Sequence, residues 1–279
     1  MNTKKIIFFD IDGTIWDWMG IIPNSTKKAI TELVKKGHIP VICSGRAGAH
    51  LINDDLLQMG FKDVVAACGN HIEVDGKLVH ERIIPISKIE KIIKLSEENR
   101  VPIVLEGPKF HWISAKGFEK DDFVDRMYEN MGKRAIKGLK VHNGMKVNKV
   151  SGDEINCSRY DLFKAGLVSE FDFIEHGLAP NVDQNPGLED NAIRAVFEFV
   201  PKGSSKAIGI HKYCEFRHVD YRDTIAVGDS ANDIEMFGAV GFSIAMGNGT
   251  DEIKKIADYI TDDIHEDGIY NAMKYLDLI

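Results

Sequence analysis

Short apolar runs, each ending in Gly, Ser or Asp, constrain this chain more than any other feature of its sequence. They alternate with segments of helical periodicity, which is the pattern of βαβ units that build a parallel sheet. The clearest runs occupy residues 5–9, 40–43, 224–227 and 242–245. Ligands of such sheets bind beyond the carboxyl ends of the strands, so we expect the four polar tips to face one crevice.

The middle of the chain has a different pattern of predicted strands and helices. Two strand-like runs near 101–105 and 110–114 bracket a Gly-Pro turn and should pair antiparallel, and Ser87 with Glu90 predicts a helix with a capping box. We therefore expect an α/β protein with a Rossmann-like parallel core from residues 1–83 and 201–279. Residues 84–200 should form an inserted α+β domain.

Composition excludes several classes of protein. The net charge is −8 with no run of basic residues, which argues against nucleic acid as the main partner. No apolar stretch approaches the roughly 20 residues that cross a bilayer, and the N-terminus lacks the pattern of a secretory signal. Four scattered cysteines suggest neither disulfides nor a zinc ribbon, and His211 with Cys214 lacks a second pair of ligands. We expect a cytoplasmic protein without membrane contact, and its oligomeric state is not readable from the sequence.

Asp10 and Asp12 follow the first apolar run and lie on the same side of an extended chain. Two neighbouring carboxylates repel each other unless a metal is shared or a proton is retained. With Asp229 from a neighbouring strand, the oxygen-rich set suits Mg²⁺, which commonly also binds a substrate phosphate. Ser44 and the ammonium of Lys206, at a predicted helix start, are groups that bind a phosphate.

Three other kinds of site can contain an Asp-Ile-Asp sequence. A calcium loop of the EF-hand kind needs an oxygen ligand at its fifth position and Gly at its sixth, where this chain has Thr14 and Ile15. Metal-dependent sugar transferases also use such a pair, and two aspartates commonly just cap a turn. The convergence of four strand tips favours a phosphate site over all three.

The motifs in their order resemble those of the haloacid dehalogenase superfamily, and more narrowly its Cof-type phosphatases of subfamily IIB. The resemblance is carried by DIDGT (10–14), CSGR (43–46), KGSSKAIGI (202–210) and GDSANDIEMF (228–237). It covers nearly all of the two core segments. It is weak in residues 84–200, although an insertion between the second and third motifs fits the position of the family's cap, here of type C2B.

The resemblance implies a role for each matching residue. Asp10 would be the nucleophile that takes the phosphoryl group, and Asp12 the general acid and base. Mg²⁺ would be held by the carboxylates of Asp10 and Asp229 and by the backbone carbonyl of Asp12. Ser44, the N–H of Gly45 and Lys206 would bind the phosphoryl oxygens, and Asn232 and Asp233 would support these groups from nearby.

Some positions depart from the family pattern or are only nominated. Ser44 stands where Thr is more usual, and Cys68-Gly69 where Asn-Gly is usual. In the cap we nominate His111, Trp112, Lys149, Arg194 and Glu198 for substrate contact, although a face of ordinary hairpin residues explains each equally well. Trp16, Asp17 and Trp18 follow the first motif, where the family has a mobile flap that could exclude water.

The expected function is Mg²⁺-dependent hydrolysis of small phosphomonoesters, either sugar phosphates or a phosphorylated cofactor, through an aspartyl-phosphate. One alternative is phosphoryl transfer between sugar positions, as in phosphomannomutases, which share this class of cap. The other is a non-catalytic protein that binds a phosphorylated ligand on a disabled core, against which the presence of Asp12 argues.

Overall fold

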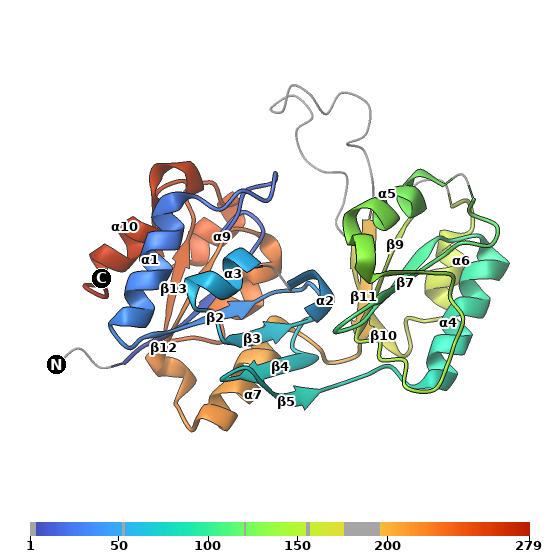
Figure 1. The fold of residues 1–279 in the computed structure, drawn as a ribbon, viewed down its shortest axis with the longest axis horizontal. Coiled ribbons are helices and arrows are strands. Elements are labelled where there is room, and N and C mark those ends of the chain that lie inside the picture. The colour runs from blue at the N-terminus through green and yellow to red at the C-terminus, as the bar shows by residue number, and fades with distance from the viewer. Residues whose placement is uncertain (1–3, 52–53, 120, 155–156, 176–195) are drawn as a thin grey trace. The chain divides into compact units, whose positions relative to one another are not determined.

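The chain forms two compact units, and each is described here by itself. The computed structural model describes residues 4–51, 54–119, 121–154, 157–175 and 196–279. The first unit combines Met1–Arg46, Leu51–Glu81 and Ser204–Ile279, and the second combines Ala47–His50 with Arg82–Gly203. In Figure 1 the first unit brings together blue and orange-to-red segments, which come from opposite ends of the sequence.

An eight-stranded sheet forms the centre of the first unit, in the order β14-β13-β12-β1-β2-β3-β4-β5. Its first six strands in this order pair in parallel, and β4 and β5 continue it antiparallel. The strands are β1 (Ile6–Phe9), β2 (Ile39–Cys43), β3 (Asp63–Ala66), β4 (His71–Val74), β5 (Lys77–Glu81), β12 (Thr224–Gly228), β13 (Phe242–Ala245) and β14 (Tyr259–Ile260).

Helices cover both faces of this sheet. They are α1 (Asn24–Lys35), α3 (Asp54–Met59), α7 (Lys206–Arg217), α8 (Ile234–Phe237), α9 (Asp251–Ile256) and α10 (Gly268–Tyr275). Of the short helix α2 (Gly48–Leu51), Leu51 belongs to this unit and the other residues to the second. Ile7 and Phe9 of β1 join one apolar cluster with α1, α3 and α10, and Ile6 and Phe8 join another with α7, α8 and α9. Both faces of β1 are therefore buried, as its unbroken apolar sequence requires.

The second unit contains a six-stranded sheet in the order β10-β11-β9-β6-β7-β8. Its pairings are antiparallel apart from the parallel pair β7 and β8. The strands are β6 (Ile103–Glu106), β7 (His111–Ile113), β8 (Ala135–Lys137), β9 (Lys149–Asp153), β10 (Phe171–Glu175) and β11 (Val196–Pro201). The antiparallel pair predicted around the Gly-Pro turn is β6 and β7.

Helices α4 (Ile86–Asn99), α5 (Asp122–Met131) and α6 (Tyr160–Ala165) complete the second unit. Ile103 and Leu105 of β6 pack with α4 and α6, whereas Val104 packs with α5, so this sheet is also covered on both faces. The predicted capping box of Ser87 and Glu90 is wrong. The helix begins at Ile86 behind Pro85, whose extended backbone occupies the N-cap without a side-chain bond.

The predicted fold class is confirmed, with a mainly parallel α/β core and a separate α+β unit from the middle of the chain. Within the described residues, no helix has both the length and the apolar character needed to cross a bilayer. Short 3₁₀ turns at Gly132–Arg134, Tyr221–Asp223, Ala231–Asp233 and Ile264–Glu266 complete the described helical structure.

Candidate active site

Three neighbouring strands of the first unit deliver the predicted groups to one edge of the sheet. Strands β12, β1 and β2 are adjacent and parallel, and Asp229, Asp10 and Ser44 follow their carboxyl ends directly. The backbone N–H of Asp10 donates to the carbonyl of Val227 at 2.9 Å, which fixes the chain as it leaves β1.

A buried ion triplet occupies the centre of this edge. The Lys206 ammonium donates to Asp10 Oδ1 and to Asp233 Oδ1, both at 2.6 Å. Burial alone would lower the pKa of Lys206, but the charges of Asp10 and Asp233 outweigh it and hold the pKa well above its usual value. The lysine is therefore a fixed cation beside Asp10.

Helix α7 places this lysine. Lys206 is its first residue, as the sequence predicted, and the Ser205 hydroxyl caps the helix by accepting from the N–H of Ile208 at 3.2 Å. Gly209 in the same helix faces Gly69 of the β3–β4 turn, and a Cβ on Gly209 would lie 2.7 Å from the Cα of Gly69. Two glycines thus allow the helix start to approach the sheet edge.

Asp229 completes a cluster of carboxylates around Asp10. Its Oδ1 accepts from the Thr14 hydroxyl at 2.9 Å, and Asp233 Oδ2 accepts from the backbone N–H of Asp229 at 3.0 Å. Burial, followed by the charges of Asp10 and Asp233, raises the pKa of Asp229 to about 8. Burial and the charge of Asp233 also raise the pKa of Asp10 despite Lys206.

The environment of Asp12 is quite different. Arg46 binds both of its oxygens, with Nε to Oδ2 at 2.7 Å and Nη2 to Oδ1 at 2.8 Å, and the Trp16 indole donates to Oδ1 at 2.9 Å. Burial acts to raise the pKa of Asp12, but the Arg46 hydrogen bonds and charge outweigh it and lower the pKa. The pKa values of the two aspartates of one motif are thus shifted in opposite directions.

Ser44 and Gly45 lie in the loop after β2. Ser44 is buried, and its hydroxyl accepts from the backbone N–H of Arg46 at 3.1 Å. Among the described residues, a Cβ on Gly45 would meet only the Cys68 sulfur, at 3.6 Å, so Cys68 closes this side of the loop.

A divalent cation fits the carboxylate cluster. One oxygen from each of Asp10, Asp229 and Asp233 lies within 4.8 Å of the others, and Lys206 is the ammonium that contacts two of them. Three carboxylates beside one lysine leave an excess of negative charge, which adds to burial in raising the pKa values of Asp10 and Asp229. A hard cation with oxygen ligands would supply the missing charge.

The supporting residues divide into two kinds. Asp233 is fully buried and contacts Lys206 directly, so it lies closer to the centre than the sequence alone indicated. Asn232 is exposed, and its side-chain oxygen accepts from the Ser230 hydroxyl at 2.8 Å.

The sequence motifs did not predict that Arg46, Trp16 and Thr14 contact the aspartates. Arg46 is the last residue of the CSGR motif (43–46), and this position was the sequence signal that could have indicated its role. Asn248 was also given no role, yet its amide donates to the Gly13 carbonyl at 2.7 Å and joins the fourth strand tip to the first motif.

The residues after the first motif form a closed loop. Asp17 is buried, and its Oδ1 accepts from the N–H groups of Met19 and Ile21, each at 2.9 Å. Trp16 packs in the apolar cluster of α1 and α10, whereas Trp18 is 64% exposed. Of the three residues nominated for a flap, Trp18 is the one that reaches solvent.

The residues nominated for substrate contact in the cap lie in different environments. Trp112 belongs to the apolar core on the α4 side of the cap sheet. His111 and Lys149 are buried, and the Lys149 ammonium pairs with Glu198 at 2.5 Å. Arg194 lies outside the described residues.

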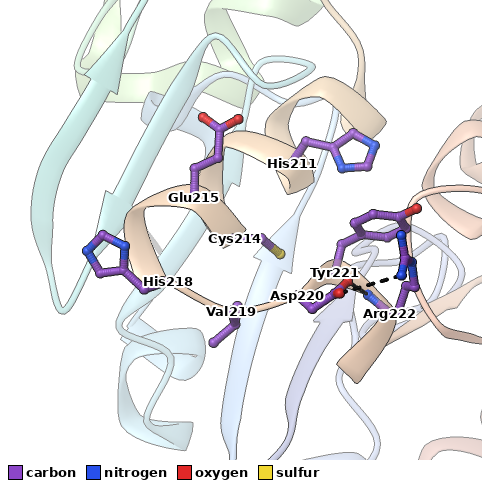
Figure 2. Close-up of a pocket in the computed structure, with 8 residues that line it drawn as sticks. All are labelled: His211, Cys214, Glu215, His218, Val219, Asp220, Tyr221 and Arg222. Carbon is purple, nitrogen blue, oxygen red and sulfur yellow. Dashed lines mark hydrogen bonds and ion pairs between the residues drawn. The ribbon is translucent and has the colours of Figure 1, made fainter.

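A surface pocket at the end of α7 contains the His211 and Cys214 pair, as Figure 2 shows. The His211 and His218 side chains point in different directions, and His211 instead packs edge-on against the Tyr221 ring. Burial raises the pKa of Cys214 to about 12, so its thiol stays protonated. These side chains do not converge on a common point.

A parallel α/β sheet here carries an Asp–Lys–Asp triplet and an Asp–Arg pair at its carboxyl edge, a set that offers carboxylate ligands for a divalent cation and fixed positive charge for an anion. The chain belongs to the haloacid dehalogenase-like hydrolases, whose family model matches residues 7–273. The resemblance stated from the motifs is confirmed, and the chain is a phosphatase of this superfamily.

Two curated relatives extend over nearly the whole chain. YkrA of Bacillus subtilis (strain 168), which carries the name of a phosphatase, is 31% identical over 289 aligned residues, covering 99% of each chain. The 5-amino-6-(5-phospho-D-ribitylamino)uracil phosphatase YcsE of the same organism is 27% identical, covering 97% of this chain and 95% of its own.

Solved structures show the same fold. A protein of Geobacillus kaustophilus HTA426 superimposes with a TM-score of 0.82 at 25% identity, covering 99% of this chain and 100% of its own. The subclass IIB sugar phosphatase BT4131 superimposes with a TM-score of 0.76 at 22% identity, with the same coverage.

Proposed function

We propose that this phosphatase hydrolyses small phosphomonoesters in a Mg²⁺-dependent reaction that passes through a phosphoryl group on Asp10. The observation that carries the proposal is the buried contact of Asp10 with Lys206 at the end of β1. A carboxylate held beside a fixed cation is oriented for attack on phosphorus, and covalent transfer divides one difficult displacement into two easier ones.

Asp10, Asp229 and Asp233 are the carboxylates available to a bound Mg²⁺, and we assign Asp10 and Asp229 to it together with the backbone carbonyl of Asp12. When bound, the ion supplies positive charge that stabilises the phosphoryl oxygens. Lys206 contributes a second fixed charge at the same place, and Ser44 and the N–H of Gly45 would donate hydrogen bonds to those oxygens.

Asp12 would move the protons. It would protonate the leaving oxygen in the first step and accept a proton from the attacking water in the second. Arg46 holds Asp12 ionised in the free enzyme, which is the form the second step needs. A phosphate dianion beside Asp12 would raise the pKa of this carboxyl by like-charge repulsion, which favours the acid form for the first step.

The substrate class rests on the relatives. YcsE is named for a substrate in which a phosphate ends a ribityl chain, and BT4131 is named as a sugar phosphatase. We infer a polyol or sugar phosphate, or a phosphorylated cofactor of similar size, as the substrate of this chain.

Turnover of an aryl phosphate and of a panel of sugar and polyol phosphates tests the proposal. We expect phosphate release with Mg²⁺, none with chelator, and a loss of at least about 10³-fold in Asp10→Asn. Asp55→Asn is the matched control, because Asp55 forms an exposed ion pair with Lys27. Phosphate release by Asp10→Asn at the control's rate would overturn the assignment of the nucleophile.

A further inference from the structure

A second cluster of metal-ligand side chains lies within the cap unit. His50 in α2, Glu106 at the end of β6 and His111 at the start of β7 each place one ligand atom within 4.8 Å of the other two. Glu106 and His111 are direct partners across the antiparallel pair of β6 and β7. His50 comes from the short segment Ala47–His50, which groups with the cap although the residues around it belong to the core.

Burial leaves polar atoms of this cluster without hydrogen bonds. His111 is fully buried and Glu106 is 2% exposed. Among the residues that the structure describes, neither ring nitrogen of His111 nor Oε2 of Glu106 has a hydrogen-bond partner. A buried polar atom without a partner costs about 1–3 kcal/mol, and a ligand bound by Glu106 Oε2 and one His111 nitrogen would offset part of this cost.

The rings of the two histidines lie against each other. Their centroids lie 4.3 Å apart with an interplanar angle of 31°. Burial lowers the pKa of His111 even though Glu106 opposes this, so His111 is uncharged at neutral pH. Two imidazolium ions this close would repel each other, whereas a metal binds the neutral ring.

The surroundings of His50 indicate which of its ring nitrogens is available to bind a metal. Its Nε2 lies 2.8 Å from the thioether sulfur of Met131, which can only accept a hydrogen bond, so this nitrogen carries the proton. In the neutral ring, Nδ1 then presents a lone pair to Glu106 Oε2, 3.6 Å away. A lone pair that faces a carboxylate requires either a second proton or a cation between them.

We propose that His50, Glu106 and His111 form a binding site in the cap for a divalent transition-metal ion of the zinc class. Two imidazoles and one carboxylate are a known zinc set that leaves a fourth position open. Mg²⁺ prefers oxygen ligands throughout, so the histidines separate this site from the carboxylates at the core sheet edge.

The neighbouring charges are compatible with a bound cation. Lys149 is the strand partner of Glu106, and its ammonium lies 2.5 Å from Glu198. Against burial, the Lys149 charge lowers the pKa of Glu106, and together with burial it lowers that of His111, so Glu198 offsets the lysine charge only in part. Ligands about 2.1 Å from a tetrahedral zinc lie about 3.4 Å from one another. Since the ligand atoms already lie within 4.8 Å of one another, the cluster closes by at most about 1.4 Å when the metal binds. Side-chain rotation of His50 and Glu106 can supply a movement of this size.

The test uses the full chain, stripped of metal and then titrated with Zn²⁺ in excess Mg²⁺ on an Asp229→Asn background, which weakens the core carboxylates as competitors. We expect one tightly bound Zn²⁺ per chain and a higher midpoint of thermal unfolding with Zn²⁺. Co²⁺ should give the visible absorption of a low-symmetry site with nitrogen ligands. This Co²⁺ measurement requires no variant in the cap and so does not depend on any cap variant folding.

Three variants locate the site. His50→Gln, Glu106→Gln and His111→Gln should each weaken Zn²⁺ binding by about 100-fold or more, because loss of a ligand costs at least as much as loss of its supporting partners. His142→Gln is the matched control, since His142 is an exposed histidine of the same unit whose Nδ1 lies 3.1 Å from the backbone carbonyl of Asn143. It should bind Zn²⁺ as the parent does.

Two outcomes would overturn the proposal. The first is no stoichiometric Zn²⁺ and no Co²⁺ absorption at pH 7.5, which would identify the cluster as a plain ion pair of protonated His50 with Glu106. The second is Zn²⁺ binding that survives both Glu106→Gln and His111→Gln at full affinity, which would place the metal elsewhere.

Discussion

Asp10 and Asp12 are two residues apart in sequence but lie in opposite electrostatic environments. Alternation along an extended chain predicted that they share a side, and their different roles came only from the family resemblance. The structure supplies a physical basis for that difference, because Lys206 and the carboxylates surround Asp10 while Arg46 and Trp16 hold Asp12. Contacts of this kind join residues far apart in sequence, so local patterns could not predict them.

The carboxylate cluster predicts how stability depends on pH in metal-free protein. In the unfolded chain Asp titrates near pH 3.9, whereas in the fold the pKa of Asp229 is about 8 and that of Asp10 is also raised. The native state binds more protons in this window, so the free energy of unfolding should fall as pH rises from about 4 to about 8. Each carboxyl contributes at most about 1.4 kcal/mol per pH unit.

Urea unfolding of chelator-treated protein at several pH values measures this slope. Asp229→Asn removes one of the two groups and should flatten the slope, while other titrating groups cancel in the comparison. Added Mg²⁺ should stabilise the wild type more at pH 8 than at pH 5, because it binds the ionised carboxylates. A slope that is identical in wild type and Asp229→Asn would contradict the raised pKa of Asp229.

At the scale of elements, the start of α7 is the part of the site that depends most on close packing. The serine cap and the lysine at the helix start were predictable from Ser205 and the helical pattern. The contact of Gly209 with Gly69 was not, because it joins a helix to a turn about 140 residues earlier in the chain. The start of α4 shows the opposite case, since Pro85 determined the boundary in place of the apparent capping box.

Gly209→Ala should destabilise the protein by about 1–3 kcal/mol and lower kcat, although Ala is the better helix former by about 1 kcal/mol. The added Cβ would lie 2.5 Å from a methyl group of Val65 and 2.7 Å from the Cα of Gly69, which forces α7 and its Lys206 outward. Chemical denaturation and steady-state kinetics measure the two effects.

Gly238→Ala is the control for this substitution. A Cβ at that position meets the carbonyl oxygen of Glu235 at 3.6 Å, an ordinary contact, and the backbone is already helical. Its free energy of unfolding should stay within about 0.5 kcal/mol of wild type. Equal stability of the two variants would show that the close approach of the glycines is unimportant.

At the scale of the whole molecule, the chain contains two sets of apolar clusters, one in each unit. The change in the pattern of predicted strands and helices after residue 83 predicted an inserted domain, because strand pairing and helix periodicity are local signals. Nothing in the local pattern indicated that Ala47–His50 would group with the cap, since this segment follows directly from a core strand and its motif.

Phe163→Ala should destabilise the cap selectively. Phe163 is fully buried, and its ring lies 5.7 Å from that of Phe197, so its removal costs about 3–5 kcal/mol. Hydrogen exchange should show lost protection in the strands and helices of the second unit and near-native protection in β1 and β12. Leu33→Ala, in the core cluster of the first unit, should give the reverse pattern. Equal loss in both units from either variant would contradict independent cores.

The measurement that tests the proposed mechanism most directly is mass spectrometry of Asp12→Asn quenched in acid during turnover of an aryl phosphate. The acidic leaving group of this ester needs little protonation, so Asp10 can still take the phosphoryl group, while water attack without the Asp12 base is slow. We predict one phosphoryl group per chain on the peptide that contains Asp10, absent in Asp10→Asn. A phosphoryl group on another residue, or continued phosphate release with none on the protein, would contradict the mechanism.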